Sequence, residues 1–165
     1  MQLNQFNQTA VQEVLEHCVK VPRWANEILA ARPFASKQAL LDFAQQQANS
    51  WTWDEVLSAL NTHPRIGEKK AQAHLSAKEQ AFSEREQATA QADQTTLDLI
   101  LQGNLAYEKR FGYIFLIKAA GLTSQEILER LQTRLNNPPQ LEQQIVKQQL
   151  AEIALLRLQQ ELTDD

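Results

Sequence analysis

The chain is poor in cysteine, glycine and proline, and it has neither a long hydrophobic run nor an excess of basic residues. A single cysteine among 165 residues excludes an intramolecular disulfide bond, and no cysteine or histidine cluster has the spacing of a structural zinc site. No stretch approaches the roughly 20 apolar residues that a transmembrane helix needs. The sequence therefore predicts no disulfide-stabilised domain, no membrane span and no metal site.

The charge balance and the first residues bear on partners and location. The chain has 16 basic and 20 acidic residues, a formal net charge of −4, whereas nucleic-acid binders usually carry a basic excess. Its first residues lack the basic start and apolar run of a secretory signal peptide. A lone cysteine also suits a reducing compartment. We therefore expect a cytoplasmic protein without nucleic-acid or membrane partners.

The composition favours helices throughout. The abundant residues are leucine, alanine and glutamine, which are good helix formers and poor strand formers, while glycine occurs only four times and proline five times. No segment alternates β-branched or aromatic residues with polar ones as a strand would. A chain of this length can hide roughly two thirds of its unfolded surface. We predict an all-α fold, a single compact domain over residues 1–165 with about eight or nine helices.

Capping residues and helix breakers predict where these helices lie. Serine or threonine followed three residues later by glutamate is typical of a helix start, and proline suits the first helical position. With the apolar periodicity, these signals predict helices over residues 8–19, from 22 to before 32, from 36, from 52 to about 62, from 76 to about 92, over 94–110, from 123 to about 136 and from 138 to about 162.

The most apolar stretch covers residues 111–117, with the sequence FGYIFLI. It is too short to span a membrane, so we interpret it as a buried central helix. Gly121 would end that helix, because glycine readily adopts the left-handed conformation that follows many helices.

His63 is the first candidate for chemistry. It follows a predicted helix end, in a loop stiffened by Pro64 and sharpened by Gly67, and reactive groups concentrate in loops that a rigid scaffold holds. Histidine also has a pKa close to neutral pH, as a general acid or base requires. The alternative is that His63 only interacts with the dipole of the preceding helix.

Ser76 and Glu79 allow two interpretations. They form a capping box at a predicted helix start, which is sufficient to explain both residues. The same helix start would offer free backbone N–H groups to an anion, with Glu79 and Gln80 in its first turn. A carboxylate held near His63 would raise the pKa of that histidine and select its tautomer.

Arg157 lies between two leucines of the last predicted helix, in a partly apolar setting. An arginine in such a place is typically paired with an anion. That anion could be a ligand or an internal salt-bridge partner. Cys18 and the tryptophans Trp24, Trp51 and Trp53 are interpreted as core or interface residues.

Six short segments, in order over most of the chain, form a combined pattern. They are Arg32-Pro33-Phe34, His63-Pro64-Arg65-Ile66-Gly67, Ser76-x-x-Glu79-Gln80, Tyr107-x-x-Arg110-Phe111-Gly112, Phe115-x-Ile117-x-Ala119-x-Gly121 and Leu156-Arg157-Leu158. Together they resemble the 2-oxo-4-hydroxy-4-carboxy-5-ureidoimidazoline (OHCU) decarboxylase family, whose members finish the conversion of urate to allantoin. One such segment would be unspecific, but several in the family's order are not.

The resemblance implies an activity and a set of site residues. The activity is decarboxylation of OHCU to (S)-allantoin and CO2 without a cofactor or metal, by a homodimer. His63 would be the catalytic acid or base and Glu79 would orient or assist it, with the residue that moves the proton left open. The resemblance places substrate contacts at Pro64, Ser76, Gln80, Arg157 and the main chain of Phe115, Leu116, Ile117, Lys118 and Ala119.

Two other functions are compatible with the sequence. A helical interaction module without catalysis would suit the glutamine-rich amphipathic helices, and it predicts that His63, Glu79 and Arg157 are scattered in space. A different cofactor-independent proton-transfer enzyme would keep these residues together but act on another substrate.

Overall fold

The computed structural model describes residues 1–9, 11–64 and 94–163, and these residues form helices without any strand. The elements are α1 (Leu3–Gln8), α2 (Gln12–Cys18), α3 (Pro22–Ala30), α4 (Lys37–Ala48), α5 (Trp53–Leu60), α7 (Gln94–Phe111), α8 (Ser124–Arg134) and α9 (Pro139–Glu161). The all-α prediction is confirmed. The polar helix expected from residue 76 lies outside the described residues. Among the described helices, none is long and apolar enough to cross a membrane.

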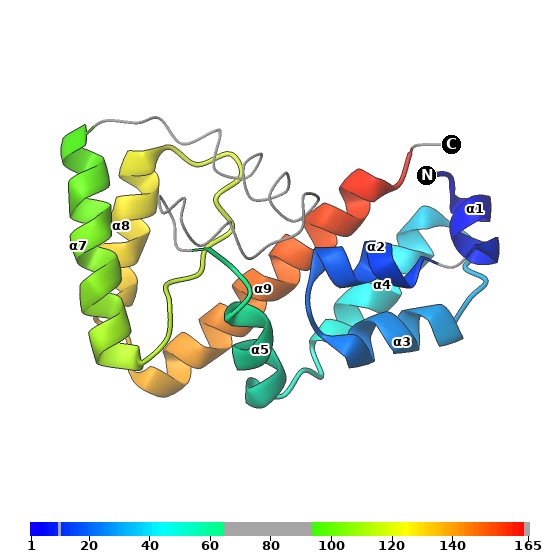
Figure 1. The fold of residues 1–165 in the computed structure, drawn as a ribbon, viewed down its shortest axis with the longest axis horizontal. Coiled ribbons are helices and arrows are strands. Elements are labelled where there is room, and N and C mark those ends of the chain that lie inside the picture. The colour runs from blue at the N-terminus through cyan, green and yellow to red at the C-terminus, as the bar shows by residue number, and fades with distance from the viewer. Residues whose placement is uncertain (10, 65–93, 164–165) are drawn as a thin grey trace.

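The longest helix, α9, runs through the middle of the molecule (Figure 1). It packs against α2, α4 and α5, which are distant from it in sequence. Figure 1 shows α1 to α4 gathered around one end of α9, whereas α7 and α8 pair with each other beyond its other end. The arrangement makes α9 the element that joins the two groups of helices.

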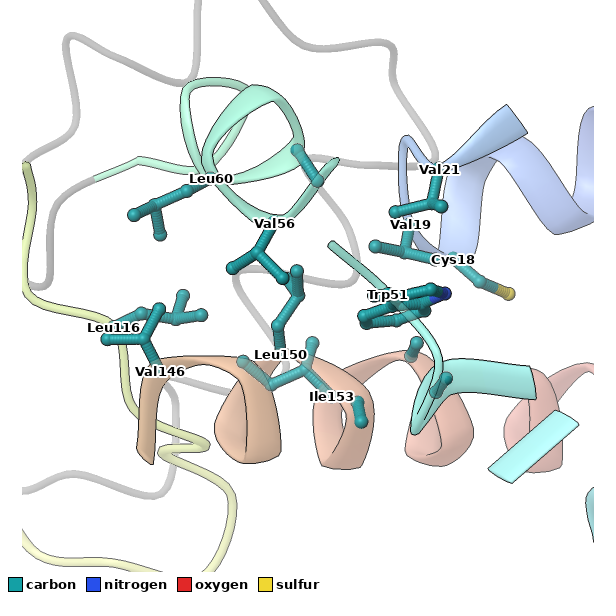
Figure 2. Close-up of a cluster of buried hydrophobic side chains, with 14 of the residues drawn as sticks. Cys18, Val19, Val21, Trp51, Val56, Leu60, Leu116, Val146, Leu150 and Ile153 are labelled. Atoms are coloured by element: carbon teal, nitrogen blue, oxygen red, sulfur yellow. The ribbon is translucent and has the colours of Figure 1, made fainter. Parts of the chain in front are cut away.

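The core lies between α9 and the helices that cover it (Figure 2). Trp24 is fully buried, and Cys18 and Trp51 are also within the core, as the sequence predicts. Figure 2 shows side chains from α5, the end of α2, α9 and the segment after α7 meeting in one cluster. Its labelled members are Cys18, Val19, Val21, Trp51, Val56, Leu60, Leu116, Val146, Leu150 and Ile153.

The predicted capping residues begin their helices as expected. The Ser36 hydroxyl accepts a hydrogen bond from the Ala39 backbone N–H at 3.0 Å. Thr52 and Thr123 each form a reciprocal capping box at the starts of α5 and α8. Proline occupies the first position of both α3 and α9. These local signals depend only on neighbouring residues, so the sequence alone locates them.

The helix predicted over residues 8–19 is present as α2, which covers Gln12–Cys18, but the sequence analysis did not predict the preceding helix α1. Helix α1 ends at Gln8, and extended Thr9 donates its hydroxyl to the Gln5 carbonyl at 2.6 Å. Asn7 exchanges two hydrogen bonds with the backbone of Phe34. These bonds fix the direction of α1 against the loop after α3, and a continuous helix would break them.

The buried central helix predicted over residues 111–117 is also wrong. Helix α7 continues to Phe111, and Gly112 then adopts φ +85°, the left-handed conformation that ends a helix. Residues 114–119 have no regular secondary structure. Burial of this segment is correctly predicted, since Phe115, Leu116 and Ile117 are each at most 4% exposed. Gly121 has φ +82° as expected, but it lies in the loop before α8.

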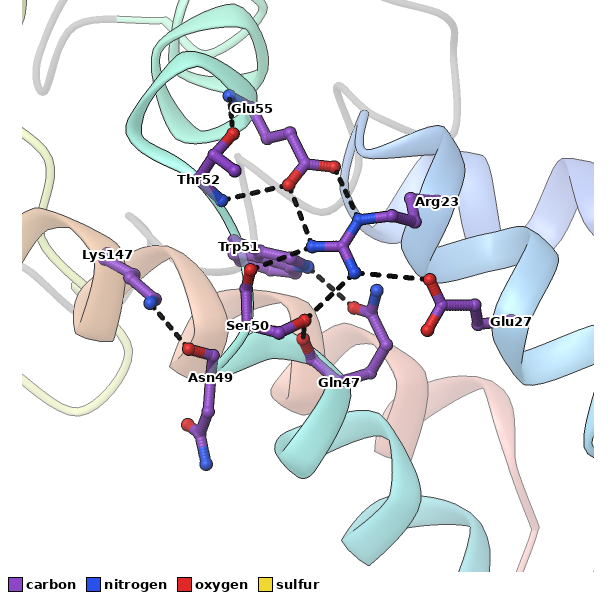
Figure 3. A network of polar contacts seen from close by, with 9 residues as sticks. All are labelled: Arg23, Glu27, Gln47, Asn49, Ser50, Trp51, Thr52, Glu55 and Lys147. Carbon is purple, nitrogen blue, oxygen red and sulfur yellow. Dashed lines mark hydrogen bonds and ion pairs between the residues drawn. The ribbon is translucent and has the colours of Figure 1, made fainter.

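A polar network joins α3 to the start of α5 (Figure 3). Arg23 binds both carboxylate oxygens of Glu55, at 3.1 and 2.9 Å, and donates to the hydroxyl and carbonyl of Ser50. The hydrogen bond from Arg23 lowers the pKa of Glu55 below its ordinary value. Because Glu55 also caps α5, this network holds the helix whose far end leads to His63.

Candidate active site

His63 lies directly after α5, as the sequence predicts. Its backbone N–H donates to the Leu60 carbonyl at 3.0 Å, a turn that directly follows the end of the helix. Pro64 follows and is buried. The helix end and the proline together restrict the backbone on both sides of the imidazole, so the position of His63 is set by the core beneath α5.

Arg157 reaches the same region from α9. Only 4% of the residue is exposed, and its guanidinium donates to the Cys18 carbonyl at 3.2 Å. That carbonyl belongs to the last residue of α2. The cation is therefore anchored where α2 and α9 pack together, and its charge is close enough to act on the imidazole of His63.

The electrostatic environment keeps His63 neutral in the free protein. Burial, and secondarily the positive charge of Arg157, lower the pKa of His63 from its ordinary 6.5 to about 3, although the residue keeps part of its surface exposed. A neutral imidazole can accept a proton near pH 7. A bound anion would offset the charge of Arg157 and raise this pKa, because an opposite charge favours the protonated form.

The segment 115–119 passes close to this region. Figure 2 shows Leu116 beside Leu60 of α5 and Val146 of α9. The Leu116 carbonyl accepts a hydrogen bond from Arg134 at 2.6 Å, and the Lys118 N–H donates to the Gln149 side chain at 2.9 Å. The backbone here is thus held by side chains and not by a helix.

A buried polar cluster behind this segment was not predicted from the sequence. Glu142 is 0% exposed and accepts hydrogen bonds from Arg134 at 2.9 and 2.6 Å, from Asn137 at 3.1 Å and from the Tyr107 hydroxyl. Burial and the bond to Glu142 raise the pKa of Tyr107, so its hydroxyl stays protonated. The available signal was Tyr107 within the family-like pattern, but a glutamate in the first turn of α9 looks like an ordinary helix start.

Not every predicted site residue can be placed. Ser76, Glu79 and Gln80 lie outside the described residues. In the part of the chain that is described, no three His, Cys, Asp or Glu side chains are grouped to hold a metal ion. Arg157 lies near enough for its charge to lower the pKa of His63, whereas the interaction-module alternative predicts that these two residues are scattered. Their proximity argues against that alternative.

The family model and the related proteins that match this chain agree with each other. The family model described as OHCU decarboxylase matches residues 4–159. A uric acid degradation bifunctional protein from Arabidopsis thaliana is 29% identical over 89% of this chain and 46% of its own length. One from Bacillus sp. (strain TB-90) is 29% identical over 97% of this chain and 32% of its own length. The chain thus spans less than half of either relative.

A solved structure has the same fold. The crystal structure of an OHCU decarboxylase in the presence of (S)-allantoin matches with a TM-score of 0.76 and 27% sequence identity. The match covers 93% of this chain and 99% of that one. The shared fold therefore extends over nearly the whole chain.

Proposed function

Because the chain belongs to the OHCU decarboxylase family, we propose that it converts OHCU to (S)-allantoin and CO2, the last step from urate to allantoin. The observation that carries this proposal is the proximity of His63 to the buried cation of Arg157. A proton acceptor beside a fixed positive charge suits a substrate that enters as an anion and loses its carboxylate.

The substrate itself supplies the place for the electrons. Its carbon C4 bears a hydroxyl and a carboxylate, and the neighbouring C5 bears the ureido group and a double bond to a ring nitrogen. When the bond from C4 to the carboxylate breaks, its electron pair forms a C4–C5 double bond and the ring nitrogen takes up a proton. The C4 hydroxyl then gives up its proton to become a carbonyl while C5 gains one. The ring acts as the electron sink, so the reaction needs no cofactor.

His63 and Arg157 have separate parts in this proposal. Neutral His63 accepts the proton of the C4 hydroxyl, which a protonated imidazole could not do. Arg157 stabilises the negative charge as it moves from the carboxylate into the ring. Glu79 orients His63 or delivers the proton to C5, and Pro64, Ser76, Gln80 and the main chain of residues 115–119 bind the substrate.

Location and assembly complete the proposal. We place the protein in the cytoplasm, which is supported by the buried free thiol of Cys18. We also propose a homodimer. Leu101 and Leu105 are 45% and 69% exposed one turn apart on α7, and adjacent exposed leucines are unusual on a surface that faces only water.

Freshly generated OHCU, incubated with the pure protein in D2O, tests the activity. We expect faster loss of substrate than in buffer and one enantiomer of allantoin, seen by circular dichroism in the first minutes. That product should carry deuterium on the ureido-bearing carbon. His63→Asn should lower turnover by about 10²–10⁴-fold, the usual contribution of a positioned acid or base, and chelators should change nothing. Breakdown no faster than in buffer would contradict the proposed function.

A further inference from the structure

Two side chains hold the backbone that the proposed function uses for substrate binding. The Leu116 carbonyl accepts from Arg134 of α8, and the Lys118 N–H donates to Gln149 of α9. Between Ile114 and Ala119 the chain has no helix or strand to fix it. Its course therefore depends on contacts from outside the segment, and these two hydrogen bonds act on the chain two residues apart.

The geometry of Arg134 makes it a rigid support. Its Nε and one terminal nitrogen bind the same oxygen of Glu142, which leaves the other terminal nitrogen for the Leu116 carbonyl. The guanidinium carbon lies 4.4 Å from the centre of the Phe115 ring, so the cation also contacts the face of the preceding side chain. A planar group bound at three nitrogens and over a ring has little freedom to rotate.

Glu142 is fixed in turn by groups other than Arg134. The Tyr107 hydroxyl from α7 and the Asn137 amide from the loop before α9 both donate to its carboxylate. Breaking such a buried pair costs far more than an exposed one, because the remaining charge has no solvent. The support of Leu116 is thus tied to the packing of α7 and α8 against the start of α9.

We infer that Arg134 and Gln149 are positioning residues, which place the main chain of residues 115–119 for the substrate; the inference rests on the proposed function. The peptide groups on both sides of Ile117 are trans, and the N–H and carbonyl of a trans peptide point in opposite directions. The Ile117 N–H therefore points away from the Leu116 carbonyl that Arg134 binds, and the Ile117 carbonyl points away from the Lys118 N–H that Gln149 binds. In this inference these two groups are the ones left for the substrate.

Gln149 offers the cleaner test, because replacing Arg134 would leave the buried carboxylate of Glu142 without its positively charged partner. Gln149→Met keeps the size of the side chain and removes the acceptor of the Lys118 N–H. We expect that amide to exchange with D2O about tenfold faster or more. We also expect kcat/KM for OHCU to fall by about threefold to tenfold, mainly through KM, with the melting temperature nearly unchanged.

Two further variants separate positioning from a general structural effect. Gln149 also donates to Glu152 at 3.2 Å, so the exchange of both residues, Gln149→Glu with Glu152→Gln, restores an acceptor at 149 and should recover most of the lost kcat/KM. Gln148→Met, at an exposed neighbouring position, should change neither measurement.

Two results would overturn the inference. Unchanged exchange at Lys118 in Gln149→Met would mean that Gln149 does not hold the segment. Faster exchange with unchanged kcat/KM would mean that the held backbone does not matter to the substrate. A wild-type protein that is inactive on OHCU would instead contradict the proposed function, while the exchange measurement still reports whether Gln149 holds the segment.

Discussion

The protonation state of His63 decides what this residue can do before substrate arrives. Its pKa of about 3 leaves the imidazole neutral at every pH at which the protein would work. A histidine in the unfolded chain takes up a proton near pH 6.5. Between these two values the unfolded state binds more protons, so the contribution of His63 to the free energy of unfolding decreases as pH falls from 6.5 towards 3.

An NMR titration of the His63 ring therefore checks the site directly. We expect no change in its chemical shift between pH 5 and 8. Arg157→Met should raise the pKa of His63, because it removes the nearby positive charge. Arg130→Met, which removes an exposed cation of α8, is the control and should leave it unchanged. A wild-type titration near pH 6.5 would show that the imidazole is hydrated and that burial and Arg157 do not lower its pKa.

For single residues, the sequence identified candidates whose neighbours along the chain are unusual, but it did not identify the residues that hold the site in place. His63 stood out because a proline and a glycine follow it closely, and Arg157 because leucines flank it. Arg134 and Glu142 gave no such signal. Each is common near a helix end, and only the folded chain shows that they meet in the interior.

Helix α7 packs closely against α8 at Gly103. A Cβ atom built there would lie 2.5 Å from Cδ2 and 3.1 Å from Cγ of Leu131. Leu131 is fully buried, so it cannot move aside into solvent. The absence of a side chain at Gly103 is what lets the two helices pack at this distance.

Gly103→Ala should accordingly destabilise the protein, although alanine is the better helix former by about 1 kcal/mol. We expect a loss of about 1–3 kcal/mol from overpacking against Leu131, seen as a lower melting temperature. Gln102→Ala, at an exposed position of the same helix, should have little effect. A higher melting temperature for Gly103→Ala would show that α8 can shift without cost.

The sequence predicted most elements and failed where the fold overrides local preference. The starts of α4, α5 and α8 follow from caps that neighbouring residues form. Helix α1 was not predicted, and its position depends on Asn7 binding Phe34, a contact that no local pattern contains. The error over residues 111–117 is different, because Gly112 and the β-branched and aromatic residues after it already disfavour a helix.

The exposed leucines of α7 lead to a prediction for the whole molecule. If Leu101 and Leu105 lie in the proposed dimer contact, a charge there must be buried against apolar surface at considerable cost. Leu105→Glu should weaken self-association by about tenfold or more in sedimentation equilibrium. Gln148→Glu adds the same charge on α9 and should leave association unchanged. Equal association of both variants would place the contact on another face.

The central position of α9 has a consequence for the order in which the molecule is made. Helices α2, α4 and α5 all pack against α9, yet about 80 residues separate the end of α5 from its start. A ribosome adds roughly 5–20 residues per second. The start of α9 is therefore synthesised on the order of 4–16 s after the end of α5, and until then the faces of α2, α4 and α5 that pack against α9 are uncovered. During that interval their apolar faces are available to chaperones and to other nascent chains, and a pause in translation between the two elements would prolong the exposure.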